Sequence, residues 1–95
     1  MQKNLRCIIF YRQSEKVKIK KVGHNTALYV SDQKGIHVLN ETALFIWEAL
    51  QEPFTFDELH YMLGEVFEGD TTKMKQDLNE ILDLFLQYDL VDTAT

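Results

Sequence analysis

The feature that most constrains the fold is a change of hydrophobic period at Asn40. Before it, residues 35–39 form a short apolar run in which Ile and Val stand on either side of a histidine. After it, four apolar residues fall on one face of a 3.6-residue period: Ala43, Ile46, Trp47 and Leu50. The Asn40 side chain suits an N-cap, because its oxygen can accept from a backbone N–H one turn into a helix. The pattern therefore predicts a strand that leads directly into a helix with one buried face.

Two more strands are predicted upstream of that point. Residues 17–22 alternate lysine with apolar side chains and end before the turn-forming Gly23-His24-Asn25, and residues 27–30 form the next apolar run. Gly35 can adopt the positive φ that closes the hairpin loop begun at Ser31 and Asp32. Loops this short cannot hold a parallel crossover, so we expect an antiparallel meander.

The two edges of this meander differ in charge. The first strand carries Lys16, Lys18, Lys20 and Lys21, and such lysines discourage a further strand from pairing. The third strand, residues 35–39, carries only His37 among apolar residues. That edge is predicted to stay open to pairing unless a helix covers it.

A second helix should begin at the capping box formed by Thr55 and Glu58. Its buried face is predicted to consist of Leu59, Met62, Leu63, Val66 and Phe67. Gly69 follows the last periodic residue, where a left-handed C-cap glycine is expected. The helix should therefore end near Glu68.

A third helix should run from a cap at Asp70 or Thr71 to about Tyr88 and carry two apolar stripes. One stripe consists of Met74, Leu78, Leu82 and Phe85, and the other of Ile81, Leu84 and Tyr88, on the side of Asp77. Either the first stripe faces the core and the second lines a groove, or the helix is buried over a wide arc.

The order of three strands and three helices predicts an α+β, winged-helix-like fold with a three-stranded antiparallel sheet followed by a three-helix bundle. Ninety-five residues suffice for one domain, which we place at residues 17–91. Residues 1–16 should form an N-terminal arm or an extra edge strand. Leu90 and Val91 should return to the core, with residues 92–95 a frayed tail.

Charge is divided unevenly along the chain. Residues 1–34 hold eight Lys or Arg against two acids, a net +6, and residues 35–95 hold two against thirteen, a net −11. Two solvated surfaces of opposite sign would explain this, as would a basic rim that steers an acidic partner.

No apolar run approaches the ~20 residues of a membrane span, and no export signal is visible, so we expect a cytoplasmic protein without membrane contact. Cys7 is the only cysteine and fits a reducing compartment.

The usual residue patterns of catalysis and metal binding are not found. His24, His37 and His60 fall in a turn, a strand and a helix, without a second ligand at coordinating spacing. We therefore expect no catalytic residue, no metal site and no cofactor, and hence no enzyme.

A winged-helix nucleic-acid-binding or regulatory module is the alternative function for this layout. The third helix would then need basic residues facing phosphates, but its middle carries Asp77, Glu80 and Asp83. Nucleic acid is therefore not expected as a partner.

Several segments resemble the PqqD-like family of RiPP recognition elements, where RiPP denotes a ribosomally synthesised and post-translationally modified peptide. They are Ala27-Leu-Tyr-Val-Ser-Asp, Gly35-Ile-His-Val-Leu-Asn-Glu-Thr-Ala, Phe45-Ile-Trp-Glu-Ala-Leu, Thr55-Phe-Asp-Glu-Leu, Asp77-Leu and Leu90-Val91. The resemblance covers roughly residues 17 to 91. This chain departs from the family at Glu52-Pro53, where a pair such as Asp-Gly is usual, and at Asp89, where a glycine usually precedes the final leucine.

The resemblance implies a non-catalytic peptide chaperone. In this family the leader segment of a precursor peptide adds as an antiparallel strand to the third strand and packs against the third helix. Carried over to this chain, the peptide-binding residues would be Ile36, His37, Val38, Leu39, Asp77, Ile81, Leu84 and Tyr88.

The implied partners are the leader region of a precursor peptide and a peptide-modifying enzyme. That enzyme would be the protease or cyclase of a lasso peptide pathway, or a radical-SAM enzyme. Within the same class, a chaperone of pyrroloquinoline quinone biosynthesis is the alternative.

Overall fold

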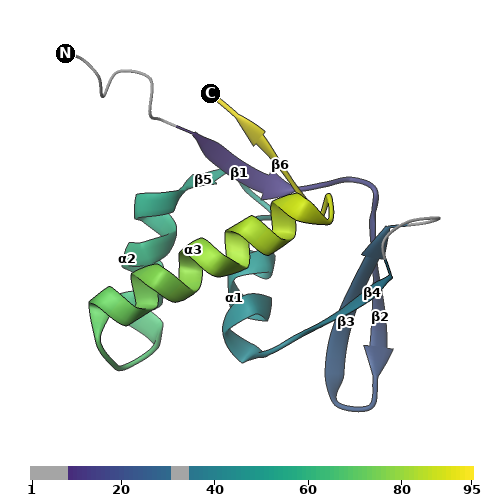
Figure 1. Ribbon diagram of the computed structural model, residues 1–95, viewed down its shortest axis with the longest axis horizontal. Coiled ribbons are helices and arrows are strands. Elements are labelled where there is room, and N and C mark those ends of the chain that lie inside the picture. The colour runs from purple at the N-terminus through teal and green to yellow at the C-terminus, as the bar shows by residue number, and fades with distance from the viewer. Residues whose placement is uncertain (1–8, 31–34) are drawn as a thin grey trace.

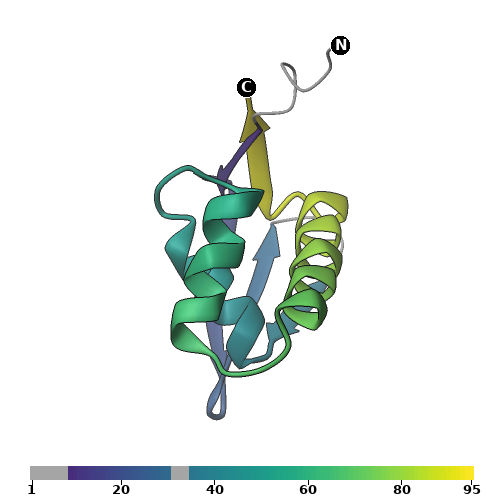
Figure 2. The same ribbon diagram turned by 90° about the vertical axis from the view of Figure 1, so that its left-hand side faces the viewer.

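The computed structural model describes residues 9–30 and 35–95, in which three helices lie on one side of two small sheets (Figures 1 and 2). The elements in chain order are β1 (Phe10–Gln13), β2 (Val17–Val22), β3 (Asn25–Val30), β4 (Ile36–Leu39), α1 (Glu41–Ala49), β5 (Phe54–Thr55), α2 (Phe56–Val66), α3 (Thr71–Gln87) and β6 (Val91–Ala94). The expected α+β class, with an antiparallel meander before three helices, is confirmed.

The meander is the sheet β2-β3-β4, and both of its pairs are antiparallel. The β2–β3 hairpin turns at Gly23, whose φ of +63° lies in the left-handed region that favours glycine. Gly35 has a φ of +87°, which fits the positive φ predicted for it. The turn predicted to start at Asp32 lies outside the described residues.

The second sheet, β5-β1-β6, was not predicted from the sequence. β1 is its central strand and pairs antiparallel with both neighbours, for example through Tyr11 with Phe54 and with Thr93. Neither an arm nor an edge strand therefore describes residues 10–13; residues 1–8 lie outside the described part. The frayed tail expected at residues 92–95 is also wrong, because Val91–Ala94 is a strand bonded to β1.

Helix starts follow the local sequence closely. Asn40 caps α1 by accepting from the Ala43 N–H at 2.8 Å. Thr55 and Glu58 form the predicted capping box on α2, with bonds of 3.1 and 2.9 Å. Asp70 caps α3 by accepting from the Thr72 N–H at 2.8 Å.

The end of α2 differs from the prediction. The helix stops at Val66, and Phe67 turns to an extended conformation with φ −113° and ψ 144°. Gly69, with φ +140°, is not a left-handed cap at the helix end. The extended Phe67 packs edge-on against Phe45, with ring centroids 5.6 Å apart, and Val66 is left 57% exposed instead of buried.

Helix α3 buries its first apolar stripe fully and its second stripe in part. Leu78, Leu82 and Phe85 are buried, and Ile81 and Tyr88 are partly buried against the core. Leu84 is 41% exposed, so the second stripe is accessible mainly at this residue.

Trp47 connects α1 to β1 and to the residue just before β6. Its indole Nε1 donates to the Leu90 carbonyl at 3.4 Å, and its own carbonyl accepts from the Gln13 side chain at 2.8 Å. Leu90 and Val91 are buried, as predicted. Asp89, just before them, has a left-handed φ of +60°, which accounts for the glycine usual at this place in the resembling family.

Candidate functional site

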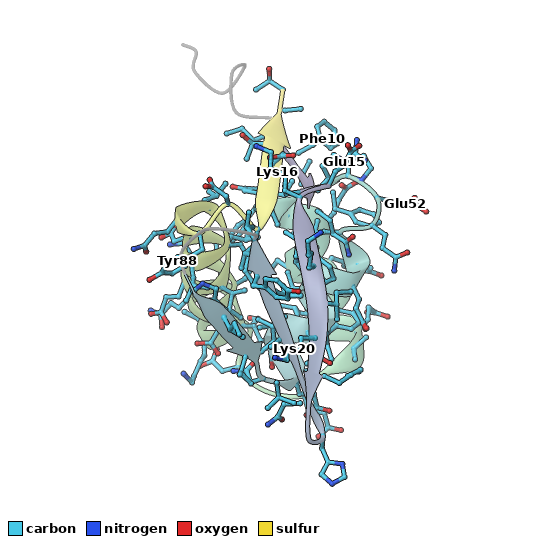
Figure 3. The ribbon with its side chains drawn as sticks, turned by 90° about the vertical axis from the view of Figure 1, so that its right-hand side faces the viewer. Phe10, Glu15, Lys16, Lys20, Glu52 and Tyr88 are labelled. Carbon is cyan, nitrogen blue, oxygen red and sulfur yellow. The ribbon has the colours of Figure 1, made fainter. Side chains whose placement is uncertain are left out.

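Strand β4 has one paired and one unpaired edge. It pairs with β3 from Thr26 opposite Leu39 to Tyr29 opposite Ile36. Within residues 9–30 and 35–95, no strand pairs with its other edge, which we call the outer edge of β4. Figure 3 shows β4 at the margin of its sheet, with Tyr88 and the C-terminal end of α3 beside it. The expectation of an open third strand is therefore met in this part of the chain.

A hollow of about 370 Å³ lies between β4 and α3, and we call it the β4–α3 groove. Its lining consists of Ile36, His37, Val38, Leu39, Asn40, Ala43, Ile81, Leu84 and Phe85. Residues from the strand, the start of α1 and both stripes of α3 thus meet in one place. Because most of them are apolar, the groove can hold the apolar side chains of an extended peptide.

The side chains of β4 alternate between the two faces of its sheet. His37 is half-buried and Leu39 is buried, whereas Ile36 and Val38 are 53% and 56% exposed. His37 and Leu39 therefore face the helices, and Ile36 and Val38 face away from them. An added strand could bond to the outward N–H and C=O groups of alternate residues only, and only two of the four side chains face α3.

The groove brings together six of the eight residues predicted for the site. Tyr88 does not line the groove itself, but its ring lies 4.1 Å from the ring of His37, which does, centroid to centroid. The Nε2 atom of His37 is buried and has no hydrogen-bond partner, the one such side-chain nitrogen or oxygen within the described residues. A buried polar atom without a partner is uncommon in folded proteins and needs a physical explanation.

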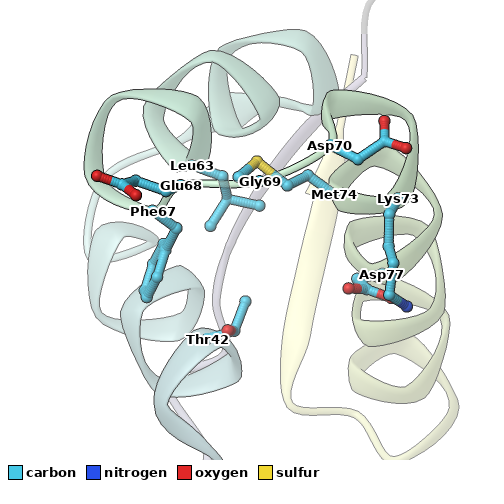
Figure 4. Close-up of a pocket in the computed structure, with 9 residues that line it drawn as sticks. All are labelled: Thr42, Leu63, Phe67, Glu68, Gly69, Asp70, Lys73, Met74 and Asp77. Atoms are coloured by element: carbon cyan, nitrogen blue, oxygen red, sulfur yellow. The ribbon is translucent and has the colours of Figure 1, made fainter.

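Asp77 does not lie in this groove. It lines a separate hollow of about 220 Å³, between the start of α3 and the ends of α1 and α2 that face it (Figure 4). There its carboxylate pairs with Lys73 at 3.5 Å, and because the side chains of Lys73 and Asp77 are 72% and 44% exposed, the pair adds little stability.

Three residues that line the groove were not predicted as site residues: Asn40, Ala43 and Phe85. The sequence assigned them to a helix cap and to core faces, and they serve in those places as well. The small side chain of Ala43, in the first turn of α1, was the only sequence feature that could have indicated a groove there. No pattern of periodicity distinguishes a core alanine from one at the bottom of a groove.

Other kinds of site receive no support from the described residues. In residues 9–30 and 35–95, no three His, Cys, Asp or Glu side chains gather as metal ligands would. None of the helices described has the length and apolar character needed to cross a membrane. The exposed flank of α3 carries Glu80 and Asp83, which would repel a phosphate backbone.

Comparison with known proteins relates both the sequence and the fold to others. The family model described as "Coenzyme PQQ synthesis protein D (PqqD)" matches residues 25–91. The structure entitled "TbiB1 in Complex with the TbiA(beta) Leader Peptide" has a TM-score of 0.71 at 17% identity, and the match covers 85% of this chain and 94% of that one. The structure "Lasso peptide synthetase B1 complexed with the leader peptide" has a TM-score of 0.71 at 15% identity, covering 86% and 96%. No curated protein matches the chain. At these identities the two structures show a shared fold.

Proposed function

Because the chain belongs to the PqqD family, whose model spans residues 25–91, we propose that it binds the leader segment of a ribosomal precursor peptide. The leader adds as an antiparallel strand to the outer edge of β4, beside α3. Two proteins of the same fold are described in complex with leader peptides, which supports this function for the present chain. The observation that carries the proposal is the outer edge of β4, with which no strand of residues 9–30 and 35–95 pairs, next to an apolar groove.

Strand addition supplies affinity without regard to leader sequence. The backbone of Ile36–Leu39 offers outward N–H and C=O groups to an extended guest. Each bond formed contributes only about 0.5–1.5 kcal/mol net, since water satisfied the same groups before. Backbone pairing alone therefore does not select one peptide over another.

Selectivity comes from leader side chains that enter the groove. Ile81 and Leu84 present partly exposed apolar surface there, and an aliphatic or aromatic side chain buried against them gains about 1.5–3 kcal/mol. Less the cost of ordering a flexible leader, these contributions correspond to a dissociation constant of about 0.1–10 μM. Tyr88, whose ring lies tilted against that of His37, is the neighbouring aromatic surface that a leader side chain next to His37 would meet.

The chain acts by binding rather than by catalysis, and it delivers the leader-bound precursor to a separate peptide-modifying enzyme. The lasso peptide type of pathway is favoured, because both structural neighbours hold leader peptides and one is a lasso peptide synthetase component. Of the eight residues proposed for binding, Asp77 is the least supported, since it lies outside the groove.

A display selection tests the proposal without knowledge of the natural precursor. A yeast-displayed library of random 16-residue peptides is panned against the chain, and the enriched peptides are synthesised and titrated. Leu84→Glu should weaken their binding by at least about tenfold, because it places a charge in the groove. Leu86→Glu is the matched control: Leu86 is 39% exposed on the same helix, does not line the groove, and its substitution should leave affinity unchanged.

Two results would contradict this function. One is an enriched peptide whose affinity falls equally in both variants. The other is a peptide that leaves the amide signals of β4 unchanged in NMR spectra of the labelled protein.

A further inference from the structure

The hollow that contains Asp77, which we call the α2–α3 hollow, is the neighbour of the β4–α3 groove. Thr42 lines the hollow, and the next residue in the chain, Ala43, lines the groove. On α3 the step is one helical turn, from Asp77 in the hollow to Ile81 in the groove. The two spaces share no lining residue, but they adjoin along the first turn of α1 and one side of α3.

The inner wall of the α2–α3 hollow is apolar. Leu63 is 1% exposed, and Phe67 and Met74 are partly buried against the core. Figure 4 shows the side chains of Leu63 and Met74 in the space between α2 and α3. The volume of about 220 Å³ is below the roughly 300–1,000 Å³ of small-molecule sites. The hollow therefore suits one apolar side chain better than a small-molecule ligand.

The rim of the hollow is negatively charged. Three carboxylates line it, those of Glu68, Asp70 and Asp77, against the single ammonium of Lys73, which gives a net charge of −2. Lys73 pairs with Asp77 at 3.5 Å, and Asp70 accepts from the Thr72 N–H. An occupant that carries lysine or arginine beside its apolar side chain is therefore favoured.

The direction of an added strand decides which part of a leader reaches this hollow. β4 runs from Ile36 to Leu39 and enters α1 through Asn40. In an antiparallel pair, the N-terminal end of the guest lies beside the C-terminal end of its partner, so residues that precede the paired segment continue past Asn40. Met74 lies seven residues before Ile81 on α3, about 10 Å along the helix axis, which about three extended residues span.

We propose that the α2–α3 hollow binds the leader segment that precedes the strand paired with β4. An apolar side chain about three residues before the one opposite Leu39 enters the hollow, and a neighbouring lysine or arginine meets Glu68 and Asp77. This inference rests on the proposed function, because the paired strand sets the position of the preceding segment. The leader is then recognised through two apolar anchors at a fixed spacing, one in the groove and one in the hollow.

Extended forms of one peptide test this proposal on the full chain. A peptide enriched in the display selection is trimmed to begin at the residue opposite Leu39, as located by NMR contacts between the two backbones. Lys-Leu-Lys-Ser is then added to its N-terminus, or Ser-Lys-Leu-Lys to its C-terminus. The N-terminal extension should tighten binding at least about tenfold and shift the methyl signal of Met74. The methyl signal of Met62, which lines neither space, should not move, and the C-terminal extension should have neither effect.

A second comparison tests the charge of the rim. An N-terminal Glu-Leu-Glu-Ser extension should bind about fivefold more weakly than the lysine extension at low salt. Double substitution Glu68→Gln and Asp77→Asn should remove that difference. The matched control, Glu80→Gln with Asp83→Asn, makes the same charge change at residues of α3 that line neither space, and should preserve the difference. Thermal melts establish that both double variants are folded.

The possible results separate this inference from leader binding itself. If the trimmed peptide shifts the amide signals of β4 but the N-terminal extension changes neither affinity nor the Met74 signal, the hollow is not a leader site and strand addition stands. If the C-terminal extension shifts Met74 instead, the guest strand runs parallel to β4 and the inference is overturned. If no enriched peptide shifts the β4 amides, leader binding fails and this inference fails with it.

Discussion

The rings of His37 and Tyr88 lie 4.1 Å apart, centroid to centroid, with an angle of 36° between their planes. This contact joins the middle of β4 to the residue that ends α3. It also buries the His37 Nε2 atom without giving it a hydrogen-bond partner. The unpaired His37 nitrogen therefore lowers the stability of the fold where β4 meets the end of α3.

Replacing the imidazole with an apolar ring should stabilise the protein. His37→Phe keeps a ring against Tyr88 and removes the unpaired nitrogen, so the free energy of unfolding should rise by about 1 kcal/mol. Urea denaturation followed by Trp47 fluorescence measures the change. Tyr88→Ala is the comparison and should lower stability, because it removes the ring contact. A clear loss of stability in His37→Phe would mean that Nε2 has a partner, such as an ordered water.

Leu82 and Leu84 should respond very differently to truncation. Leu82 is 2% exposed in the core, so Leu82→Ala should cost about 2–5 kcal/mol of unfolding free energy. Leu84 is 41% exposed, and Leu84→Ala should cost less than about 1 kcal/mol while it weakens peptide binding. Denaturation midpoints and peptide titrations of the two variants give both quantities. Equal destabilisation would show that the second stripe of α3 belongs to the core.

Amide exchange should reveal which edge of β4 a peptide occupies. Neighbouring residues in an antiparallel strand direct their N–H groups to opposite edges, so one of His37 and Val38 bonds to β3 and the other faces outward. In the protein without peptide, one of these two amides should exchange slowly and the other fast. A selected peptide should slow the fast one, as measured by NMR. If the fast amide is unaffected by a bound peptide, strand addition is not the binding mode.

High pH should destabilise the protein through Tyr11. Burial, and next the negative charge of Asp83, raise the pKa of Tyr11 above its ordinary value of 10.0. The unfolded chain then loses this proton at lower pH than the folded chain does. The stabilisation is complete below pH 10.0 and is lost as the pH rises through the folded-state pKa.

The test compares unfolding free energies of the wild type and Tyr11→Phe between neutral pH and the alkaline range. The wild type should lose more stability than the variant above the ordinary tyrosine pKa. Asp83→Asn should reduce this difference in part, because it removes the smaller of the two causes. An identical alkaline decline in wild type and Tyr11→Phe would contradict the assignment.

Asp89 should prefer glycine to alanine as its replacement. Its φ of +60° is a left-handed conformation that a Cβ atom disfavours and that glycine adopts without strain. Asp89→Gly should therefore be about 1 kcal/mol more stable than Asp89→Ala, as judged from paired denaturation curves. Because both substitutions remove the same carboxylate, the difference in their unfolding free energies measures the cost of the left-handed backbone conformation. Equal stabilities would indicate that the turn before β6 relaxes to another conformation.

Local signals in the sequence predicted most of the elements that position the groove. The Asn40 cap, the Thr55–Glu58 capping box and the cap at Asp70 each depend on a side chain and a backbone group within three residues. The meander followed from short loops and alternating residues, for the same reason. Short-range hydrogen bonds and turn geometry need no distant partner, so they can be identified without a structure.

Features that depend on distant parts of the chain could not be predicted. β1 pairs with β6 across about eighty residues, and the polar strand Val91–Ala94 has no apolar alternation to reveal it. Val66 has helical spacing for the core, yet the early end of α2 leaves it exposed. Asp77 lies on the same side of α3 as Ile81, but it faces a different hollow.

The sequence by itself therefore determined where strands and helices begin, which stripes are apolar and which sheet edge carries no charge. The tertiary structure alone decided which of those stripes is covered, because burial depends on what packs opposite. Helix caps, turns and hydrophobic periods depend on a few neighbouring residues, so they can be identified along the chain without a structure. The groove and the second sheet arise only when segments far apart in sequence come together.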